Sequence, residues 1–527
     1  MKKIAFTFLC IAFFEVAVLA QSLKDAIKQT TNEQFETADA SFKAIIQREP
    51  SNGENYFYYG ENYFKNDNME MAKAMYQTGI DVNATHPLCY VGLGKILWYN
   101  KNEQEAKTNF YKATTLSGSK NGTVLMEIAE VYINAENKNI PEAMNLLNQA
   151  AKLEPKNAEV YILMGDAFLE QQNGGEAIKN YEKATELNKA SAAATLRIGK
   201  LYSRAKNYNL ALDFYKKAIE IDASFAPAYR EKAEIYYRAG RYQDAVAEYK
   251  KFLELNNNLS AKIRYTGFLY QAKQYKDAIT QGSEVFNKDS GNIYLYRYLG
   301  YSYYENAEYP KGLSKMESFF SKAGKELKII QQDYEYYGKL LAKNGKDSLG
   351  LIALTKAADM DTSKKDLYSD IGAAYFKMKK YPELINSYNT KIAASVKPSA
   401  NDYFGLGRAY YFSKDFVNAD SAFAKVIRSS PDYPAGYLWR GRVNSQQDPK
   451  NEKMLAKPYY EMYMSKVKPE DAEKNKKDLV EANTFIGVYY MKNKDFSTAK
   501  TYFKKVIELD PSNENAKKFL ASPEANK

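Results

Sequence analysis

Side chains that commonly carry catalysis or hold a metal are rare in this sequence. His86 is its only histidine, and its two cysteines are Cys10 and Cys89. A histidine that transfers protons or binds a metal needs partner side chains at suitable spacing, but none surrounds His86, which directly precedes Pro87. Cys89 is interpreted as a small hydrophobic residue in the first turn of a helix. We therefore expect a chain that is not an enzyme and that uses no metal and no cofactor.

Two glycine motifs resemble a phosphate-binding loop only superficially. Gly92-Leu-Gly-Lys95 and Gly405-Leu-Gly-Arg408 lack the GxxxxGK[ST] spacing, and the first lies inside a predicted helix. Both motifs fall at the same place of a repeated pattern, which identifies their glycines as packing residues. Acidic residues are numerous, but their helical spacing is typical of solvent-facing positions. No catalytic set is predicted.

A 34-residue unit organises the chain and is most regular in residues 158–257. The landmarks that recur at this spacing are Gly165, Gly199 and Ala233, then Phe168, Tyr202 and Tyr236, then Ala177, Ala211 and Ala245, then Tyr181, Tyr215 and Tyr249. Within each unit, apolar and small residues at i, i+3, i+4 and i+7 predict two amphipathic helices joined by a turn. One such pair cannot bury both faces, so the units must stack into a solenoid.

This pattern resembles the tetratricopeptide repeat, with a small residue at place 8, an aromatic residue at 11, alanine at 20 and proline near 32. Residues 400–433 and 480–513 match it closely. The resemblance implies an all-α, right-handed superhelical solenoid of about 14 helix–turn–helix units, in an exported bacterial protein of Bacteroidota-like type. The glycines expected to pack the helix pairs are Gly60, Gly94, Gly165, Gly199, Gly300, Gly338, Gly372, Gly407, Gly441 and Gly487.

Residues 1–20 read as a secretory signal, with basic Lys2 and Lys3, an apolar run and a small residue, Ala20, at the cleavage point. An uncleaved membrane anchor is the alternative. No later stretch has the ~20 apolar residues of a membrane helix, so no integral span is expected after cleavage. The net charge of +11 then indicates an anionic envelope surface or an acidic partner, and not a nucleic acid. A periplasmic or outer-membrane-associated location is expected.

The predicted organisation follows from these patterns. It comprises the signal peptide (1–20), a degenerate N-terminal capping repeat (21–52), repeats two to nine (53–321), a break (322–330), repeats ten to thirteen as far as the first helix of the thirteenth (331–447), an irregular second helix with a charged insertion (448–479), the last repeat (480–511) and a C-terminal solvating helix and tail (512–527).

In the family that the chain resembles, first helices line a concave groove, and places 2, 5, 9, 12 and 13 contact the ligand. Carried over to this sequence, the predicted partner-binding groove comprises Lys200, Arg204, Arg230, Tyr237, Arg238, Tyr270, Arg297, Tyr301, Tyr304, Arg408, Tyr411 and Arg442. Tyrosine and arginine are enriched where binding energy concentrates. Family members that hold chaperone C-termini carry asparagine at place 9, which this chain lacks, so that specificity is not expected.

The sequence therefore favours a non-catalytic protein–protein interaction scaffold of the cell envelope, holding an extended or helical segment of a partner protein, for example of an envelope or secretion complex. The alternative is a glycan or small-ligand binding module of an outer-membrane uptake system, in which Tyr237, Tyr301, Tyr304 and Tyr411 would stack on sugar rings. A role as an accessory of an envelope hydrolase is not separated from the first hypothesis by sequence.

Overall fold

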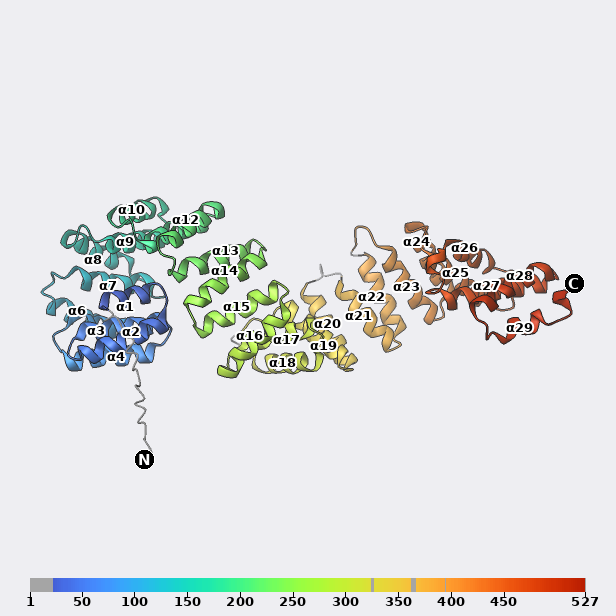
Figure 1. Cartoon of the computed structure of the whole chain (residues 1–527), viewed down its shortest axis with the longest axis horizontal. Helices are drawn as coiled ribbons and strands as arrows, with labels where there is room; N and C mark the ends of the chain where they lie inside the picture. Colours follow the sequence, from blue (N-terminus) through green and yellow to red (C-terminus); the bar gives the residue numbers. More distant parts are fainter. Residues whose placement is uncertain (1–21, 324–326, 362–365, 394, 527) are drawn as a thin grey trace, which may run out of the picture. The chain divides into compact units, whose positions relative to one another are not determined.

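The computed structural model describes residues 22–323, 327–361, 366–393 and 395–526, and within them the chain is built from 29 α-helices and two short 3₁₀ helices (Figure 1). The predicted signal segment and residues 324–326 of the predicted break lie outside the described residues. The all-α prediction is confirmed. None of the described helices is both long and apolar enough to span a membrane.

The chain divides into two compact units, residues 1–302 (unit 1) and 303–527 (unit 2), and each is described by itself. First helices in unit 1 are α1 (Leu23–Thr31), α3 (Gly53–Lys65), α5 (Pro87–Tyr99), α7 (Gly122–Asn134), α9 (Ala158–Glu170), α11 (Ala192–Arg204), α13 (Ala226–Arg238), α15 (Leu259–Gln271) and most of α17 (Ile293–Glu305). Second helices are α2 (Phe35–Arg48), α4 (Met69–Val82), α6 (Glu103–Leu116), α8 (Ile140–Leu153), α10 (Gly174–Leu187), α12 (Tyr208–Ile221), α14 (Tyr242–Leu255) and α16 (Tyr275–Lys288).

Unit 2 continues the alternation from α18 (Tyr309–Lys322) onward. Its first helices are α19 (Gln331–Lys343), α21 (Asp366–Lys377), α23 (Ala400–Phe412), α25 (Pro434–Gln447) and α27 (Lys476–Lys492), followed at the C-terminus by α29 (Glu514–Leu520) and η2 (Glu524–Asn526). Its second helices after α18 are α20 (Asp347–Met360), α22 (Tyr381–Ala393), α24 (Phe416–Ser429), α26 (Lys457–Lys466) and α28 (Phe496–Leu509). In the stretch 448–479, α26 has only 10 residues, the 3₁₀ helix η1 (Pro469–Asp471) follows it, and α27 is lengthened to 17 residues.

Each helix pair is closed by a short turn of recurring chemistry. In the turn between α9 and α10, Gln172 adopts a left-handed backbone conformation with φ of 61°. The side chain of Asn173 then accepts a hydrogen bond from the backbone N–H of Glu176 and caps α10. The same arrangement recurs at Lys206 and Asn207 before α12. These turns fix the angle at which the second helix returns over the first.

The contact between paired helices explains the glycine at place 8. A Cβ on Gly165 would lie 2.3 Å from Cε1 of Tyr181, which is fully buried between α9 and α10. Gly60 and Gly94 face Tyr76 and Phe110 in the same way, at 2.2 and 2.4 Å. Because real Cβ atoms do not approach a ring so closely, a larger residue at these positions would force the ring to move. The aromatic ring on the second helix, such as that of Tyr181, fills the space that the glycine leaves.

Candidate functional site

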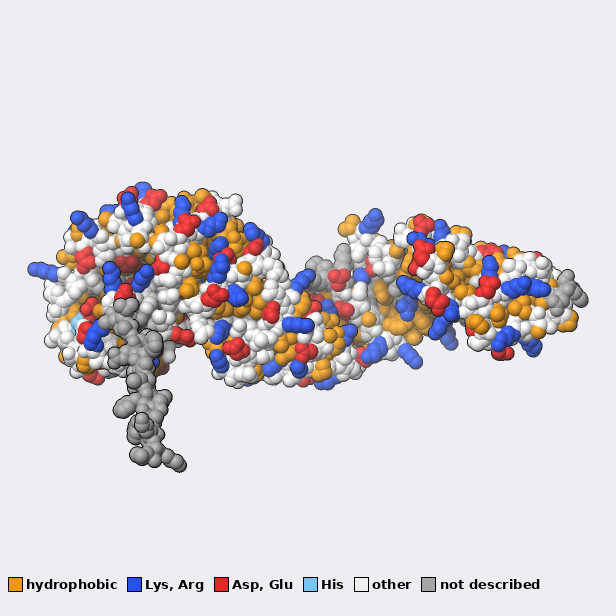
Figure 2. Space-filling model, in the orientation of Figure 1, with side chains coloured by type: hydrophobic (Ala, Val, Ile, Leu, Met, Phe, Trp, Pro, Cys, Tyr) orange, Lys and Arg blue, Asp and Glu red, His pale blue; other side chains and the backbone are white. Residues whose placement is uncertain are grey.

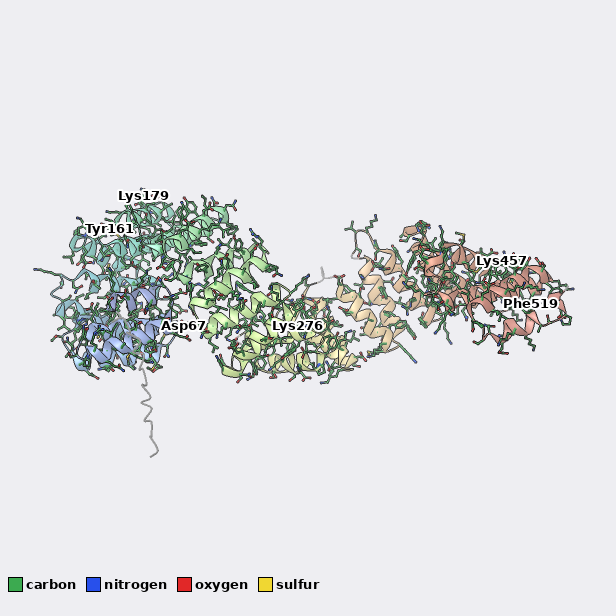
Figure 3. All side chains as sticks on the ribbon, viewed as in Figure 1. Asp67, Tyr161, Lys179, Lys276, Lys457 and Phe519 are labelled. Carbon is green, nitrogen blue, oxygen red and sulfur yellow. The ribbon has the colours of Figure 1, made fainter. Side chains whose placement is uncertain are left out.

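The first helices of unit 1 surround a concave cavity of about 600 Å³, here called the interior of unit 1. Its walls come from α1, α3, α7, α9, α11 and α13 and the residues that lead into them, with Phe35 at the start of α2. The charged residues on these walls are Glu33, Glu61, Lys65, Glu127, Glu130, Glu159, Asp166, Arg197, Lys200 and Arg230. The outer surface carries second helices, as at Tyr208 of α12 and at Lys179 of α10, which is labelled in Figure 3.

A buried ion pair, Glu61–Lys95, anchors one wall of the interior. The Lys95 ammonium donates to both carboxylate oxygens of Glu61 at 2.7 Å, and the Lys95 side chain is only 3% exposed. The hydroxyl of Tyr76 also donates to Glu61, at 2.7 Å. Burial alone would lower the pKa of Lys95, but the surrounding carboxylates, Glu61 first, outweigh it and raise the pKa. Lys95 is therefore charged and fixed in place.

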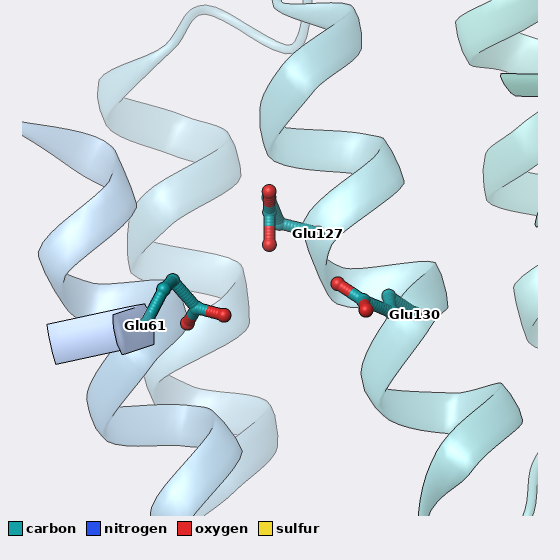
Figure 4. A group of neighbouring side chains, drawn as sticks. All are labelled: Glu61, Glu127 and Glu130. Atoms are coloured by element: carbon teal, nitrogen blue, oxygen red, sulfur yellow. The ribbon is translucent and has the colours of Figure 1, made fainter. Parts of the chain in front are cut away.

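Glu61, Glu127 and Glu130 form an acidic group whose ligand atoms lie within 4.8 Å of one another (Figure 4). Three carboxylates are a chemically reasonable donor set for a divalent cation. Lys95 already supplies a cation here, because its ammonium is also 3.8 Å from Glu127 Oε2. Burial raises the pKa of Glu127 to about 8, even though Lys95 opposes the shift. The geometry fits a lysine-centred ion cluster better than a metal centre.

Other charges of the interior are paired between neighbouring units. The Arg197 guanidinium donates to Asp166 at 2.9 and 3.1 Å, and Tyr181 donates to the same carboxylate at 2.7 Å. Lys200 lies 3.3 Å from Glu231. Farther along unit 1, Arg264 makes a bidentate pair with Glu234 at 2.9 and 2.8 Å. An acid and a base on successive first helices thus pair between α9 and α11, α11 and α13, and α13 and α15.

Unit 1 also closes on itself through side chains that are about 190 residues apart in sequence. We call this set the latch, and its members are Lys28, Asn32 and Glu33 on one side and Asp222, Ser224 and Arg230 on the other. Lys28 Nζ lies 3.0 Å from Asp222, and the amide of Asn32 donates to Asp222 at 3.0 Å and to Ser224 Oγ at 2.9 Å. Arg230 pairs with Glu33.

Hydrogen bonding sets the charge state of the latch. Burial would raise the pKa of Asp222, but hydrogen bonds from Ser224, Asn32 and Lys28 outweigh it and hold the pKa at about 2. Beside the latch, Asn257 donates to Glu36 at 3.2 Å, and Asn258 donates to Asn66 at 2.5 Å. The first unit thereby bonds to α13 and to the loop before it, and contacts beside the latch reach the loop before α15. The side-chain contacts that enclose the interior are thus polar.

The structure distributes the predicted groove residues unevenly. Lys200, Arg204, Arg230 and Arg238 line the interior of unit 1 and the recess that continues it. In unit 2, Arg408, Tyr411 and Arg442 gather round the ring of Trp439, and Tyr304 packs edge-on against Tyr336. Each unit therefore holds its own group of predicted residues.

Three groove assignments need correction. Tyr270, Arg297 and Tyr301 are buried, with Tyr301 only 2% exposed, so they serve packing and cannot offer a face to a ligand. The reason is that aromatic residues of the eighth and ninth units pack on one another. The ring centres of Tyr270 and Tyr301, for example, are 5.4 Å apart. The Tyr237 ring is covered by Phe268, whose ring centre is 4.7 Å away, and by the Arg264 guanidinium, whose Cζ lies 4.9 Å from the Tyr237 ring centre. These occupied ring faces give the sugar-stacking alternative no support.

Sequence reasoning missed the paired residues and the latch. Glu61 and Lys95 are 34 residues apart and have opposite charge at the same repeat place, so a comparison of successive units would have indicated their contact. Arg197 and Arg264 lie 31 and 30 residues after their partners, Asp166 and Glu234, which is nearly one period. The latch has no such signal, because it depends on curvature summed over six units.

Family models identify the same repeat that the 34-residue spacing predicts. Models of the tetratricopeptide repeat match residues 88–120, 162–227, 226–259 and 480–513. No curated protein matches the chain significantly.

Among solved structures, the C-terminal part of a TPR repeat-containing protein from Cytophaga hutchinsonii is 36% identical over 49% of this chain and 100% of its own, with a TM-score of 0.45. A tetratricopeptide repeat protein from Parabacteroides merdae is 16% identical over 48% of this chain and 98% of its own, with a TM-score of 0.32. The repeat matches and the identity to the Cytophaga protein show that the chain belongs to the tetratricopeptide repeat family, whose repeats are generally non-catalytic protein–protein interaction modules.

Proposed function

We propose that this chain is a non-catalytic scaffold of the bacterial cell envelope that holds a segment of a partner protein in the interior of unit 1. The observation that carries the proposal is the lining of that interior, which successive first helices supply almost alone. Lys200, Arg204 and Arg238 border it without being buried, so they can reach a ligand.

The chemistry of the walls favours a short extended segment. The cavity has both donors and acceptors, including Asn134 and Lys200, which match the alternating polar groups of an extended backbone. Most wall charges already pair with one another, so a ligand with a long run of one charge gains little there. The latch encloses the cavity, so a partner enters by its chain terminus or after the latch has opened.

The envelope location is a proposal based on residues 1–20, whose pattern predicts export. N-terminal sequencing of the protein recovered from a periplasmic or outer-membrane fraction tests it. The proposal expects a mature chain that starts at Gln21. A chain that retains Met1 and fractionates with the cytosol contradicts it.

Site-specific crosslinking tests the binding proposal. A photoreactive benzoylphenylalanine replaces Lys200 in one variant and Lys179 in the control, which is exposed on α10 at the outer surface (Figure 3). After irradiation in cells, the variant at position 200 should give one discrete protein adduct that the control lacks, and mass spectrometry should map it to one segment of the partner. The same adducts at both positions, or none at position 200, would refute a partner in the interior.

A further inference from the structure

A second surface, on unit 2, has a different chemistry. Five aromatic rings contact one another in a continuous cluster, which we call the aromatic shelf: Phe376, Tyr381, Tyr411, Phe412 and Trp439. The shelf joins α21, α22, α23 and α25, and Phe412 is 38% exposed. Tyrosine, tryptophan and arginine are the residues most enriched at binding hot spots.

Arg408 of α23 is held on this shelf in an unusual state. Its guanidinium lies 4.9 Å from the centre of the Phe376 ring and 5.6 Å from that of Trp439, so two rings fix its position. Its Nε is buried without a hydrogen-bond partner. Among the residues that the structure describes, no carboxylate lies within ion-pair distance of Arg408.

Other arginines of the first helices contrast with Arg408. Arg442 also lies over Trp439, at 5.1 Å, but it donates to Glu481 at 2.6 Å and to Asp478 at 2.6 Å. Arg440 makes a bidentate pair with Asp420, as Arg264 does with Glu234 in unit 1. A guanidinium that is partly removed from water and lacks an acid loses solvation without the compensation that these arginines have. A carboxylate from a binding partner would supply that compensation at the terminal nitrogens of Arg408.

The rim of the shelf carries excess positive charge. Residues 371–415 contain seven basic and three acidic residues. Lys379, Lys380 and Lys414 are exposed in the turns that follow α21 and α23. Figure 2 shows hydrophobic side chains gathered over α22 and α23, with Lys and Arg side chains beside them. Such a rim attracts an acidic partner and raises its association rate.

We propose that the aromatic shelf and Arg408 form a docking site for an acidic protein segment, in which an Asp or Glu carboxylate takes both terminal nitrogens of Arg408 and apolar side chains pack on the rings. This site goes beyond the interior of unit 1 and does not depend on it. The guanidinium is already positioned, so little side-chain entropy is lost on binding. Arginine suits this role because its planar fork matches a carboxylate.

The ring geometry favours a protein over a nucleic acid. Bases need open ring faces on which to stack. Here the rings cross edge to face, at 80° between Phe376 and Phe412 and 88° between Tyr411 and Trp439. The faces of Trp439 are occupied by Phe423, stacked at 25°, and by the two guanidinium groups. Little aromatic face is left for a base.

The test uses the mature full-length chain and a fluorescent peptide that alternates glutamate with leucine. A peptide with glutamine in place of glutamate is its control, and anisotropy reports the affinity. The glutamate peptide should bind at least tenfold more tightly than the glutamine peptide. Arg408→Gln should weaken its binding roughly tenfold, and Arg408→Lys should recover part of the loss. Arg428→Gln, which removes the same charge from an exposed position on α24, should change binding less than twofold.

Several outcomes overturn the proposal. Equal affinity for the two peptides, or equal effects of Arg408→Gln and Arg428→Gln, removes the role of a carboxylate. Tighter, Arg408-dependent binding of a single-stranded oligonucleotide or of phosphatidylserine vesicles assigns the site to another class of ligand. If Arg408→Gln does not fold, as judged by circular dichroism, the rim variant Lys379→Gln/Lys380→Gln decides. It should weaken binding a few-fold and flatten the salt dependence, and unchanged binding contradicts the proposal.

Discussion

Lys95 in unit 1 and Arg408 in unit 2 occupy the same place of the repeat, each directly after its packing glycine, yet their surroundings are opposite. Lys95 is buried against two oxygens of Glu61 at 2.7 Å. Arg408 is held by two rings and meets no described carboxylate. The comparison shows that place 9 serves two uses. The Lys95 ammonium is used within the scaffold, whereas the Arg408 guanidinium is available to a ligand; Arg442, also at place 9 of unit 2, is paired with Glu481.

The difference extends to the surfaces around these residues. In unit 1, the charges on the walls of the interior pair with one another, and the latch encloses the cavity. Beside the shelf of unit 2, Lys377 and Lys391 pair with Asp347 and Asp402, whereas the exposed Lys379, Lys380 and Lys414 form no ion pair with the residues that the structure describes. One repeat family thus supplies, within one chain, an enclosed polar cavity and an exposed cationic aromatic surface.

The largest expected contrast comes from removing the two cations at place 9. Lys95→Met leaves the Glu61 carboxylate buried without its ammonium and should cost about 3–5 kcal/mol of unfolding free energy. Arg408→Met loses stacking but strands no charge and should cost about 1 kcal/mol or less. Urea unfolding followed by circular dichroism compares them. Similar losses in both variants would mean that Arg408 has an internal partner or that Lys95 lacks one.

The double variant Glu61→Gln/Lys95→Met separates charge from packing. Because it removes both members of the pair, it should recover much of the loss caused by Lys95→Met alone. No recovery would show that the packing of the Lys95 side chain, and not its charge, stabilises this wall.

A second contrast concerns the packing glycines. A Cβ at Gly199 would lie 2.6 Å from Cε1 of the buried Tyr215, so Gly199→Ala should cost about 1–3 kcal/mol. A Cβ at Gly372 would lie 3.2 Å from Leu384 Cδ1, and alanine also favours the helix, so Gly372→Ala should change stability by less than about 1 kcal/mol. Thermal melts of both variants provide the measurement. An equal shift in melting temperature would contradict tighter packing at Gly199 than at Gly372.

The latch should make unit 1 sensitive to acid. The folded-state pKa of Asp222, about 2, lies below the usual value of 3.8, so its stabilisation is present above pH 4 and is lost as the pH falls toward 2. The shift corresponds to roughly 2 kcal/mol. Asp222→Asn should remove this component and speed hydrogen exchange in α1 at neutral pH.

Asp432 of unit 2 provides the matched control for the latch. It pairs with Lys466 at 2.7 Å but is 92% exposed, so Asp432→Asn should leave exchange in its neighbours nearly unchanged. Equal exchange effects at Asp222 and Asp432 would show that the latch is an ordinary surface pair.

The smallest effect is expected at the edge of the latch. The contact from Asn257 to Glu36 is exposed, so Glu36→Gln should change stability by less than about 0.5 kcal/mol. Urea unfolding again measures it. A loss as large as that of Asp222→Asn would extend the latch from the loop before α13 to the loop before α15.

The sequence predicted the helix pairs well because their signals are local. The 34-residue spacing and the turn residues correctly indicated where helices alternate, although α27 starts at Lys476, within the predicted charged insertion. Burial across units was harder to predict. Tyr301 carries the pattern of a groove residue, but its ring meets Tyr270 of the preceding unit. The latch could not be predicted from the sequence, because no single residue encodes the small rotation between successive units. These rotations add up along unit 1 and bring Asn32 to Ser224.

Closure of unit 1 distinguishes its interior from the shelf of unit 2, and a crosslink tests it most directly. Asn32 and Ser224 hydrogen-bond at 2.9 Å, and Cys89 is buried, so a chain expressed from Gln21 onward offers no accessible native thiol. After mild oxidation, Asn32→Cys/Ser224→Cys should form one intramolecular disulfide in nearly all molecules, seen as a mobility shift that a reductant reverses. Neither single variant should shift. A double variant that stays reduced, or that forms only intermolecular disulfides, would contradict a closed unit 1.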